Sequence, residues 1–294
     1  MEIVDDNPGA RAAEAPKKEE SPPSRGQAPR VDPGHPRSPL VELARGAAWL
    51  VGLAAVLQLV TRALGASPLA AVLAGAVIAD IGSARAGVRW DDPDGQGPAN
   101  DPRRVALRLG TGAGLAAIAV ALTVALALAL GWAGVAATGT PAVAFLLVLL
   151  RSAAFAFREE LLLTGIAFAA AARAGVPSRY ALAFAALAHG AAVTLAPGSS
   201  PAAVTLAVAL GALTARLWQR RGPLAAIAAA ATFHVLAGAG LRGDLLDITW
   251  RAGSLTTGAR ASGEVAWLAA ACVVAVLLLD ERRLDGRGRA RVAK

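Results

Sequence analysis

Ionisable side chains inside long apolar segments are the residues of this sequence best suited to chemistry. Four of them are spread over three such segments: Glu159 and Glu160 in 141–173, His189 in 178–195, and His234 in 222–241. An ionisable group within a bilayer costs about 2.5–3.5 kcal/mol on insertion scales, so its presence indicates a function. A buried carboxylate can deprotonate a water molecule, and an imidazole can orient that water or stabilise an oxyanion. These are the parts that hydrolysis of an amide requires.

The composition predicts that membrane-spanning helices surround these residues. The chain has 294 residues, of which 55% are hydrophobic and 17% charged, and its mean hydropathy is +0.52. One soluble core cannot bury so much apolar surface. A spanning helix needs about 20 apolar residues. The segments that fit are 43–63, 66–84, 107–133, 141–173, 178–195, 201–219, 222–241 and 263–281. We therefore expect an all-α fold, a polytopic membrane bundle of about eight transmembrane helices.

Charge patterning divides the chain and orients it in the membrane. Residues 1–39 are rich in proline and in both charge signs, which predicts a disordered cytoplasmic arm. Residues 40–281 form the transmembrane domain, with its motif-bearing core at 141–241, and 282–294 form a basic cytoplasmic tail. Arginine and lysine gather in alternate connections, so both termini are expected in the cytoplasm. The net charge of +8 is therefore interpreted as topological, and nucleic acid is not an expected partner.

Two features of amino-acid usage bear on the source and on the redox chemistry. Arginine far outnumbers lysine and alanine is abundant, a bias that indicates a GC-rich bacterial genome. We therefore expect a multi-pass protein of the bacterial inner (plasma) membrane. The single cysteine, Cys272, excludes an intramolecular disulfide.

The predicted topology brings the four ionisable residues to one depth. Counted at about 1.5 Å per residue from the cytoplasmic ends of their helices, they lie roughly 16–21 Å into the membrane. Adjacent carboxylates at such a depth repel, so the two glutamates can divide the base and acid roles unless an arginine compensates them. Arg158 and Arg151 are available for that compensation, because residues seven apart lie on nearly one helix face.

Other hydrolytic chemistries have less support in the sequence. Two histidines and carboxylates can hold zinc with an open position, but there is no H-E-x-x-H pair on one helix. The G-x-S-x-G elbow of many serine hydrolases is also missing. We therefore expect no metal and no cofactor.

Three short motifs contain the ionisable residues, in the order of the chain. They are Glu159-Glu160-Leu161-Leu162-Leu163-Thr164, Ala185-Ala186-Leu187-Ala188-His189 with Phe184 just before it, and His234-Val235-Leu236-Ala237-Gly238. They resemble the motifs E-E-x-x-x-R, F-x-x-x-H and H-x-x-x-N of the CAAX protease and bacteriocin-processing family, also called the CPBP or Abi family. Its members are glutamic-type intramembrane endopeptidases. The resemblance covers about residues 141–241.

The resemblance implies a role for each site residue. Glu159 and His189 would activate water, His234 would donate to the oxyanion, Glu160 would support the pair, and no metal would be required. The substrate would be a membrane-associated protein or peptide. Two positions depart from the family pattern: Thr164 stands where the motif has arginine, and Gly238 where it has a polar residue. Arg158 or Arg151 would have to replace the lost charge.

Two other functions remain open at this point. The first is a catalytically inactive family member that binds peptides or membrane proteins in immunity or assembly, which the departures at Thr164 and Gly238 favour. The second is a small proton-coupled transporter, because ionisable chains within a membrane also form proton relays. The lipid bilayer is a partner in every case, and the sequence does not indicate an oligomeric state.

Overall fold

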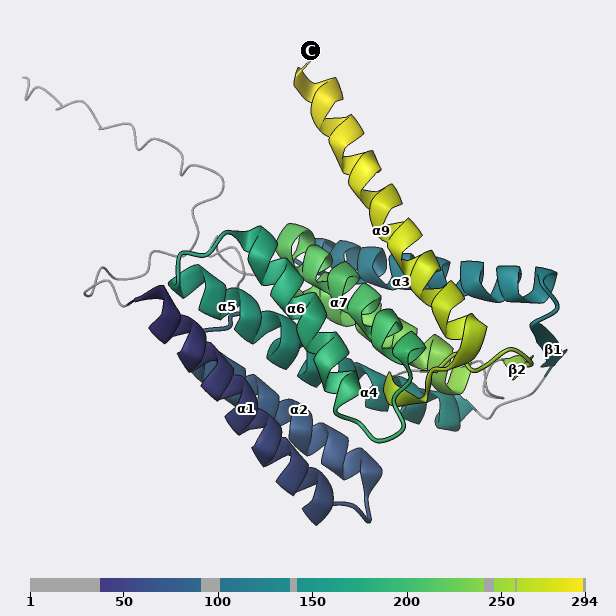
Figure 1. The fold of residues 1–294 in the computed structure, drawn as a ribbon, viewed down its shortest axis with the longest axis horizontal. Coiled ribbons are helices and arrows are strands. Elements are labelled where there is room, and N and C mark those ends of the chain that lie inside the picture. Colours follow the sequence, from purple (N-terminus) through teal and green to yellow (C-terminus); the bar gives the residue numbers. More distant parts are fainter. Residues whose placement is uncertain (1–37, 91–100, 138–141, 241–245, 257, 293–294) are drawn as a thin grey trace, which may run out of the picture. The chain divides into compact units, whose positions relative to one another are not determined.

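Helices make up most of the chain. The structure, a computed structural model, describes residues 38–90, 101–137, 142–240, 246–256 and 258–292 (Figure 1). The α-helices are α1 (Pro39–Ala63), α2 (Pro68–Arg85), α3 (Pro102–Ala129), α4 (Ala142–Glu159), α5 (Ile166–Arg173), α6 (Ser178–Thr194), α7 (Pro201–Arg221), α8 (Pro223–Val235) and α9 (Gly263–Val292). Two π-helical segments, η1 (Glu160–Gly165) and η2 (Leu236–Gly240), and a 3₁₀ turn, η3 (Gly258–Arg260), complete the helical structure that is described.

Each of the segments predicted as an apolar helix contains a helix. Within the described residues, five helices are long and apolar enough to cross a membrane, namely α1, α2, α3, α7 and the Gly263–Arg283 part of α9. The expected count of about eight spans is not confirmed. The segment 141–173 is divided by η1, and α6 and α8 have 17 and 13 residues, fewer than the roughly 20 that span a bilayer.

Proline and small polar residues fix where helices begin. A proline occupies the first turn of α1, α2, α3, α7 and α8, where its missing N–H leaves no hydrogen bond unmade. Ser38, Asp101 and Ser200 cap α1, α3 and α7 by accepting a backbone N–H. The start of α1 at Pro39 agrees with the change in composition there, while residues 1–37 of the predicted arm lie outside the described residues. At the other end, α9 continues to Val292, so it does not end where the basic tail was placed.

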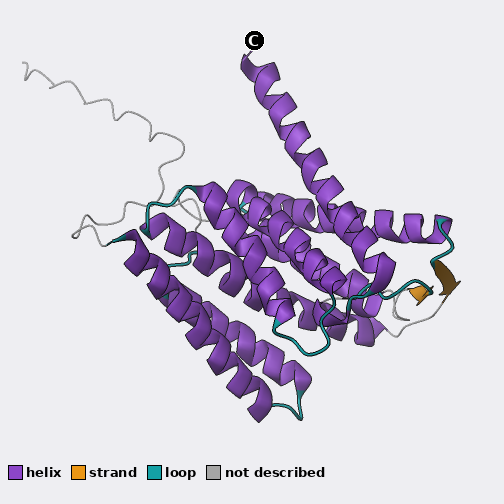
Figure 2. Cartoon of the chain, viewed as in Figure 1, coloured by secondary structure: helices purple, strands orange, loops and turns teal. Residues whose placement is uncertain are grey.

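A short β-ribbon is added to the mostly helical fold that was predicted (Figure 2). Strand β1 (Ala133–Ala137) pairs antiparallel with β2 (Leu246–Trp250), with Ala133 opposite Trp250. Both strands lie almost entirely between the predicted apolar segments. Their pairing joins parts of the chain that are far apart in sequence, and a strand of five residues carries little local signal of its own.

Close packing of small residues holds α8 in the bundle. The main buried cluster includes Leu213 of α7, Phe233 of α8 and Val265 of α9, all at most 1% exposed. Gly112 of α3 packs directly on the backbone of α8, because a Cβ there would lie 1.9 Å from the carbonyl oxygen of Ala225. Gaps this narrow between helices require residues without side chains. The position of α8 matters because it carries His234.

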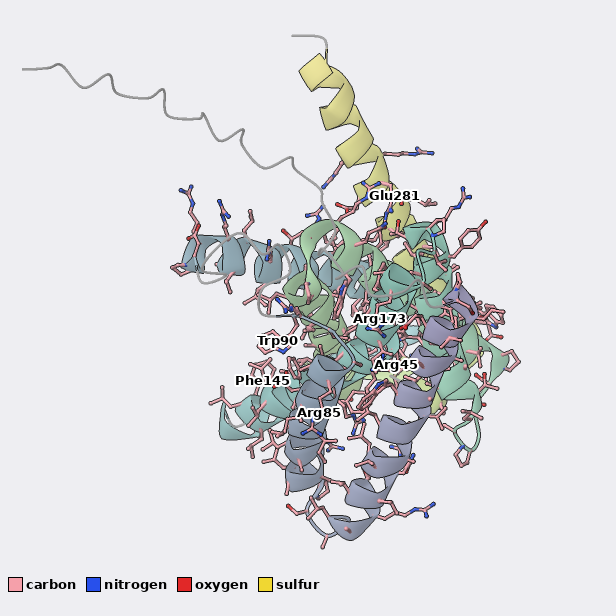
Figure 3. The ribbon with its side chains drawn as sticks, turned by 90° about the vertical axis from the view of Figure 1, so that its left-hand side faces the viewer. Arg45, Arg85, Trp90, Phe145, Arg173 and Glu281 are labelled. Carbon is pink, nitrogen blue, oxygen red and sulfur yellow. The ribbon has the colours of Figure 1, made fainter. Side chains whose placement is uncertain are left out.

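A second cluster joins α1 and α2 to the helical segment that carries the glutamates. Leu53 of α1 and Leu161 of η1 are among its buried members. At the end of α5, Arg173 Nε donates to Glu42 Oε2 of α1 at 3.1 Å, and its Nη1 donates to the carbonyl of Ala86. Figure 3 shows Arg173 beside α1. This ion pair fixes one end of the segment whose middle contains Glu159 and Glu160.

Candidate active site

The paired glutamates lie where an α-helix changes into a π-helical turn. Glu159 is the last residue of α4, and Glu160 is the first of η1. A π-helical turn inside an α-helix is rare and occurs often at functional sites. The side chain of Glu159 is 23% exposed, whereas Glu160 is only 1% exposed. Although they are neighbours in sequence, the two carboxylates therefore have different surroundings.

The histidines of α6 and α8 both approach Glu159. His234 Nε2 lies 3.1 Å from Glu159 Oε2, and His189 Nδ1 lies 3.8 Å from Glu159 Oε1. The His234 ring also packs edge-on against Phe155 of α4, with ring centroids 4.9 Å apart. An ionised carboxylate only accepts hydrogen bonds, so the 3.1 Å contact requires a proton on His234 Nε2. In this arrangement His234 donates to Glu159.

Thr164 connects Glu160 to His189. Its hydroxyl donates to Glu160 Oε2 at 2.8 Å and lies 3.3 Å from His189 Nε2. Because the hydroxyl hydrogen is used on Glu160, a lone pair of Thr164 is free to accept from His189 Nε2–H. The neutral imidazole then has no proton on Nδ1, the ring nitrogen that faces Glu159. Glu160, Thr164 and His189 thus form one hydrogen-bonded chain that sets the His189 tautomer.

Helix α7 closes the site behind His189. Gly211 lies against the imidazole, and a Cβ at this position would come within 2.9 Å of several His189 side-chain atoms. Thr214, one turn further along α7, is 1% exposed and its hydroxyl donates to the Gly211 carbonyl at 3.3 Å. The absence of a side chain at Gly211 therefore gives His189 its place between α6 and α7.

Glu159, His189 and His234 line a cavity of about 40 Å³. The other lining residues are Val193 of α6, Ala203, Leu206, Ala207 and Leu210 of α7, and Thr256 and Gly258 from the loop that precedes α9. A cavity that holds one water molecule needs about 10–15 Å³, so this one can hold more than one. Among the described residues, the wall is apolar apart from Glu159, the two histidines and Thr256, and Glu160 does not line it.

Of the two arginines expected to compensate the carboxylates, Arg158 lies close enough for its charge to act on Glu159, although its guanidinium packs elsewhere. The Arg158 guanidinium stacks over the Phe155 ring at 4.6 Å and packs against Gly75 of α2. Among the described residues, no ion pair joins Arg158 to Glu159 or Glu160. Neighbouring residues of a helix point about 100° apart, so Arg158 faces away from the cavity. Arg151 is exposed and lies about two turns before Glu159 on α4.

Several residues of the site carried no signal in the sequence. Thr214, Gly211 and Thr256 reach it from α7 and from the loop before α9, and none belongs to a motif. Gly238, where the family motif has a polar residue, lies in η2 with φ −87° and ψ −113°, outside helical geometry. Within the part of the chain that is described, no group of three or more His, Cys, Asp or Glu side chains is arranged to hold a metal ion.

No protein-family model, curated protein sequence or solved structure matches this chain. The resemblance to the CPBP family therefore stays a prediction.

Proposed function

We propose that this chain is an intramembrane endopeptidase that hydrolyses a peptide bond of a membrane-associated protein or peptide. One observation carries the proposal: Glu159, hydrogen-bonded to one imidazole and close to a second, lines a cavity large enough for water inside an apolar helical bundle. Buried carboxylates paired with histidines are suited to general acid–base work.

The first step is the activation of water by Glu159. Glu159 Oε1 and His189 Nδ1 are 3.8 Å apart, and both are hydrogen-bond acceptors in the tautomer that Thr164 favours. A water molecule between them donates to both, which is a common bridge across such a distance. Glu159 takes one proton, the hydroxide adds to the scissile carbonyl carbon, and the protonated carboxyl then gives its proton to the leaving nitrogen as the C–N bond breaks.

The surroundings of the two glutamates favour Glu159 as the base. It lines the cavity, whereas Glu160 is buried behind it and hydrogen-bonded to Thr164. Glu160 therefore orients His189. The geometry also favours a role for His234 that differs from the one implied by the resemblance, because its Nε2–H is directed at Glu159 and orients the base.

The cellular setting belongs to the same proposal. The chain would lie in a bacterial inner membrane as a multi-pass protein of about eight spans with both termini cytoplasmic. Arginines in alternate connections and the apolar helices support this topology. The short helices α6 and α8 carry the histidines and pack on α7, so the site would be reached by substrates within or beside the bilayer.

The proposal is tested by comparing protein termini in membranes and medium of producing cells, because this measurement assumes no substrate. Cells that carry the wild-type chain are compared with cells that carry Glu159→Gln, which keeps the shape and removes the base. Glu264→Gln is the matched control, since Glu264 is an exposed glutamate at the start of α9. All three proteins are first shown to accumulate equally in the membrane.

We expect new termini with the wild type and with Glu264→Gln, and none with Glu159→Gln. Identical termini in all three would refute the endopeptidase and would favour the inactive binder. Proton uptake into proteoliposomes driven by a solute gradient would instead favour the transporter.

A further inference from the structure

Thr256 carries a buried hydroxyl that the contacts described above do not use. The residue is 4% exposed, and its Oγ1 has no hydrogen-bond partner among the described residues. A buried polar group without a partner is unfavourable and uncommon in native proteins. Thr256 also lines the cavity of Glu159, His189 and His234. Among the described residues of that wall, Thr256 alone has a side-chain hydroxyl, and this hydroxyl is available to a molecule that enters the cavity.

The loop that carries Thr256 is fastened on both sides of it. Ser254 and Ser262 form an antiparallel bridge, with N···O distances of 2.9 and 3.1 Å. The Ser200 hydroxyl, at the start of α7, donates to the Ala261 carbonyl at 2.9 Å. Next to the bridge, a Cβ on Gly253 would lie 2.1 Å from the Ser262 carbonyl oxygen, so the two backbones meet where no side chain fits. These contacts hold Thr256 against the cavity.

We propose that the Thr256 hydroxyl donates a hydrogen bond to the oxyanion that forms at the scissile carbonyl. This inference rests on the proposed function. When hydroxide adds to the carbonyl carbon, the C=O π electrons move to oxygen, and the negative charge needs a donor in place before the reaction. Thr256 Oγ–H supplies it without transferring its proton. An electron pair on the oxyanion then re-forms the C=O π bond as the C–N bond breaks, and Glu159 protonates the leaving nitrogen.

The other candidates for this role are already engaged. His234 Nε2–H is directed at Glu159, and His189 Nε2 lies 3.3 Å from the Thr164 hydroxyl. Gly238, at the position where the family motif has a polar side chain, has none. Thr256 reaches the cavity from a different part of the chain and provides the donor that the third motif lacks.

The experiment follows the protein termini that appear with the wild type and not with Glu159→Gln. It measures how fast these termini appear after expression of each variant is induced. Thr256→Val removes the hydroxyl and keeps the shape, and Thr256→Ser keeps the hydroxyl. Thr205→Val is the matched control, because the Thr205 hydroxyl donates to the Pro201 carbonyl within α7 and does not line the cavity. We expect Thr256→Val to be slower by about 100–1000-fold, the usual effect of losing one oxyanion donor. The rate for Thr256→Ser should stay within about 10-fold of the wild-type rate, and the rate for Thr205→Val should equal the wild-type rate.

Thermal unfolding in detergent separates this role from a structural one. The Thr256 hydroxyl has no described partner to lose, so Thr256→Val should unfold at or above the wild-type temperature. Cleavage by Thr256→Val within threefold of wild type, with Glu159→Gln inactive, would overturn the inference and leave the proposed function standing. If wild type and Glu159→Gln give the same termini, both fail together. Should Thr256→Val not reach the membrane, Thr256→Ala takes its place with the same expectations.

Discussion

Three glycines of α3 allow a sharp test of the helix packing. Gly110, Gly112 and Gly114 lie in one short run, but only Gly112 meets another helix closely. A Cβ on Gly112 would lie 1.9 Å from the carbonyl oxygen of Ala225, whereas a Cβ on Gly110 or Gly114 would meet no described atom within 4 Å beyond its own stretch of helix. We predict that Gly112→Ala destabilises the protein, while the same change at the other two positions does not.

The size of the effect follows from the overlap. Real Cβ contacts essentially never fall under 3.0 Å, so α8 would have to retreat by 3.0 − 1.9 = 1.1 Å, and the obstructing atoms belong to its backbone. Overpacking of this kind costs about 1–3 kcal/mol. Replacing a helical glycine by alanine gains up to about 1 kcal/mol, and this gain is common to all three variants. Gly112→Ala should therefore be less stable than either control by about 1–3 kcal/mol.

The assay is unfolding of the purified proteins in mixed micelles, titrated with sodium dodecyl sulfate and followed by far-UV circular dichroism. A Gly112→Ala protein as stable as Gly110→Ala and Gly114→Ala would refute the close approach of α3 and α8. The comparison of protein termini provides a second measurement, because a shift of α8 would also move His234 relative to Glu159. Misplacement of a catalytic group by about 1 Å can cost roughly 100-fold in rate.

Two further substitutions test the contacts of the carboxylate–histidine cluster. Thr164→Val removes the hydroxyl that donates to the buried Glu160 at 2.8 Å, so the free energy of unfolding should fall by about 1.5–3 kcal/mol while Thr164→Ser stays near wild type. A loss below about 0.5 kcal/mol in the same micelle titration would show that Thr164 is not an important donor to Glu160. Gly211→Ala places a Cβ 2.9 Å from His189 and should lower the unfolding free energy by about 1–3 kcal/mol and slow the formation of new termini. Gly52→Ala on α1, where a Cβ has open space, should change neither quantity, and equal behaviour of the two variants would contradict the packing of His189 on α7.

The position of the helices could be predicted because apolar length and proline boundaries are local properties. Each predicted segment contains a helix, and Pro39, Pro68, Pro102 and Pro201 begin helices close to the expected residues. Whether a helix crosses the membrane depends on its length and surroundings. The helices α6 and α8 are shorter than a bilayer-spanning helix, so the number of spans could not be derived from apolar segments alone. The β1–β2 ribbon could not be predicted, since its pairing is between distant connections.

In the site, too, local features could be predicted from the sequence and long-range contacts could not. Counting residues along three helices predicted that Glu159, Glu160, His189 and His234 share one level, and the structure brings all four together. Their catalytic roles remain predictions. The supporting arginines were chosen by helix face alone. Arg158 packs against Phe155 and α2 and forms no ion pair with either glutamate among the described residues, although its charge acts on Glu159. Thr256 could not be found, because no local pattern shows that a residue in a long loop will line a cavity built by α4, α6, α7 and α8.

The replacement of the motif arginine by Thr164 has a physical consequence for the two carboxylates. Position 164 is fully buried, so an arginine there would place a positive charge in the interior, where Glu160 would be its ion-pair partner. The uncharged threonine donates one hydrogen bond to Glu160 and accepts one from His189, and Glu159 then has both imidazoles near it. The groups close to Glu159 thus include two histidines, which give and take protons, whereas Arg158, whose charge also acts on Glu159, stays charged. On this reasoning the departure at Thr164 leaves the acid–base pair at Glu159 intact, and Thr164→Arg should unfold the protein more readily than Thr164→Val in the micelle titration.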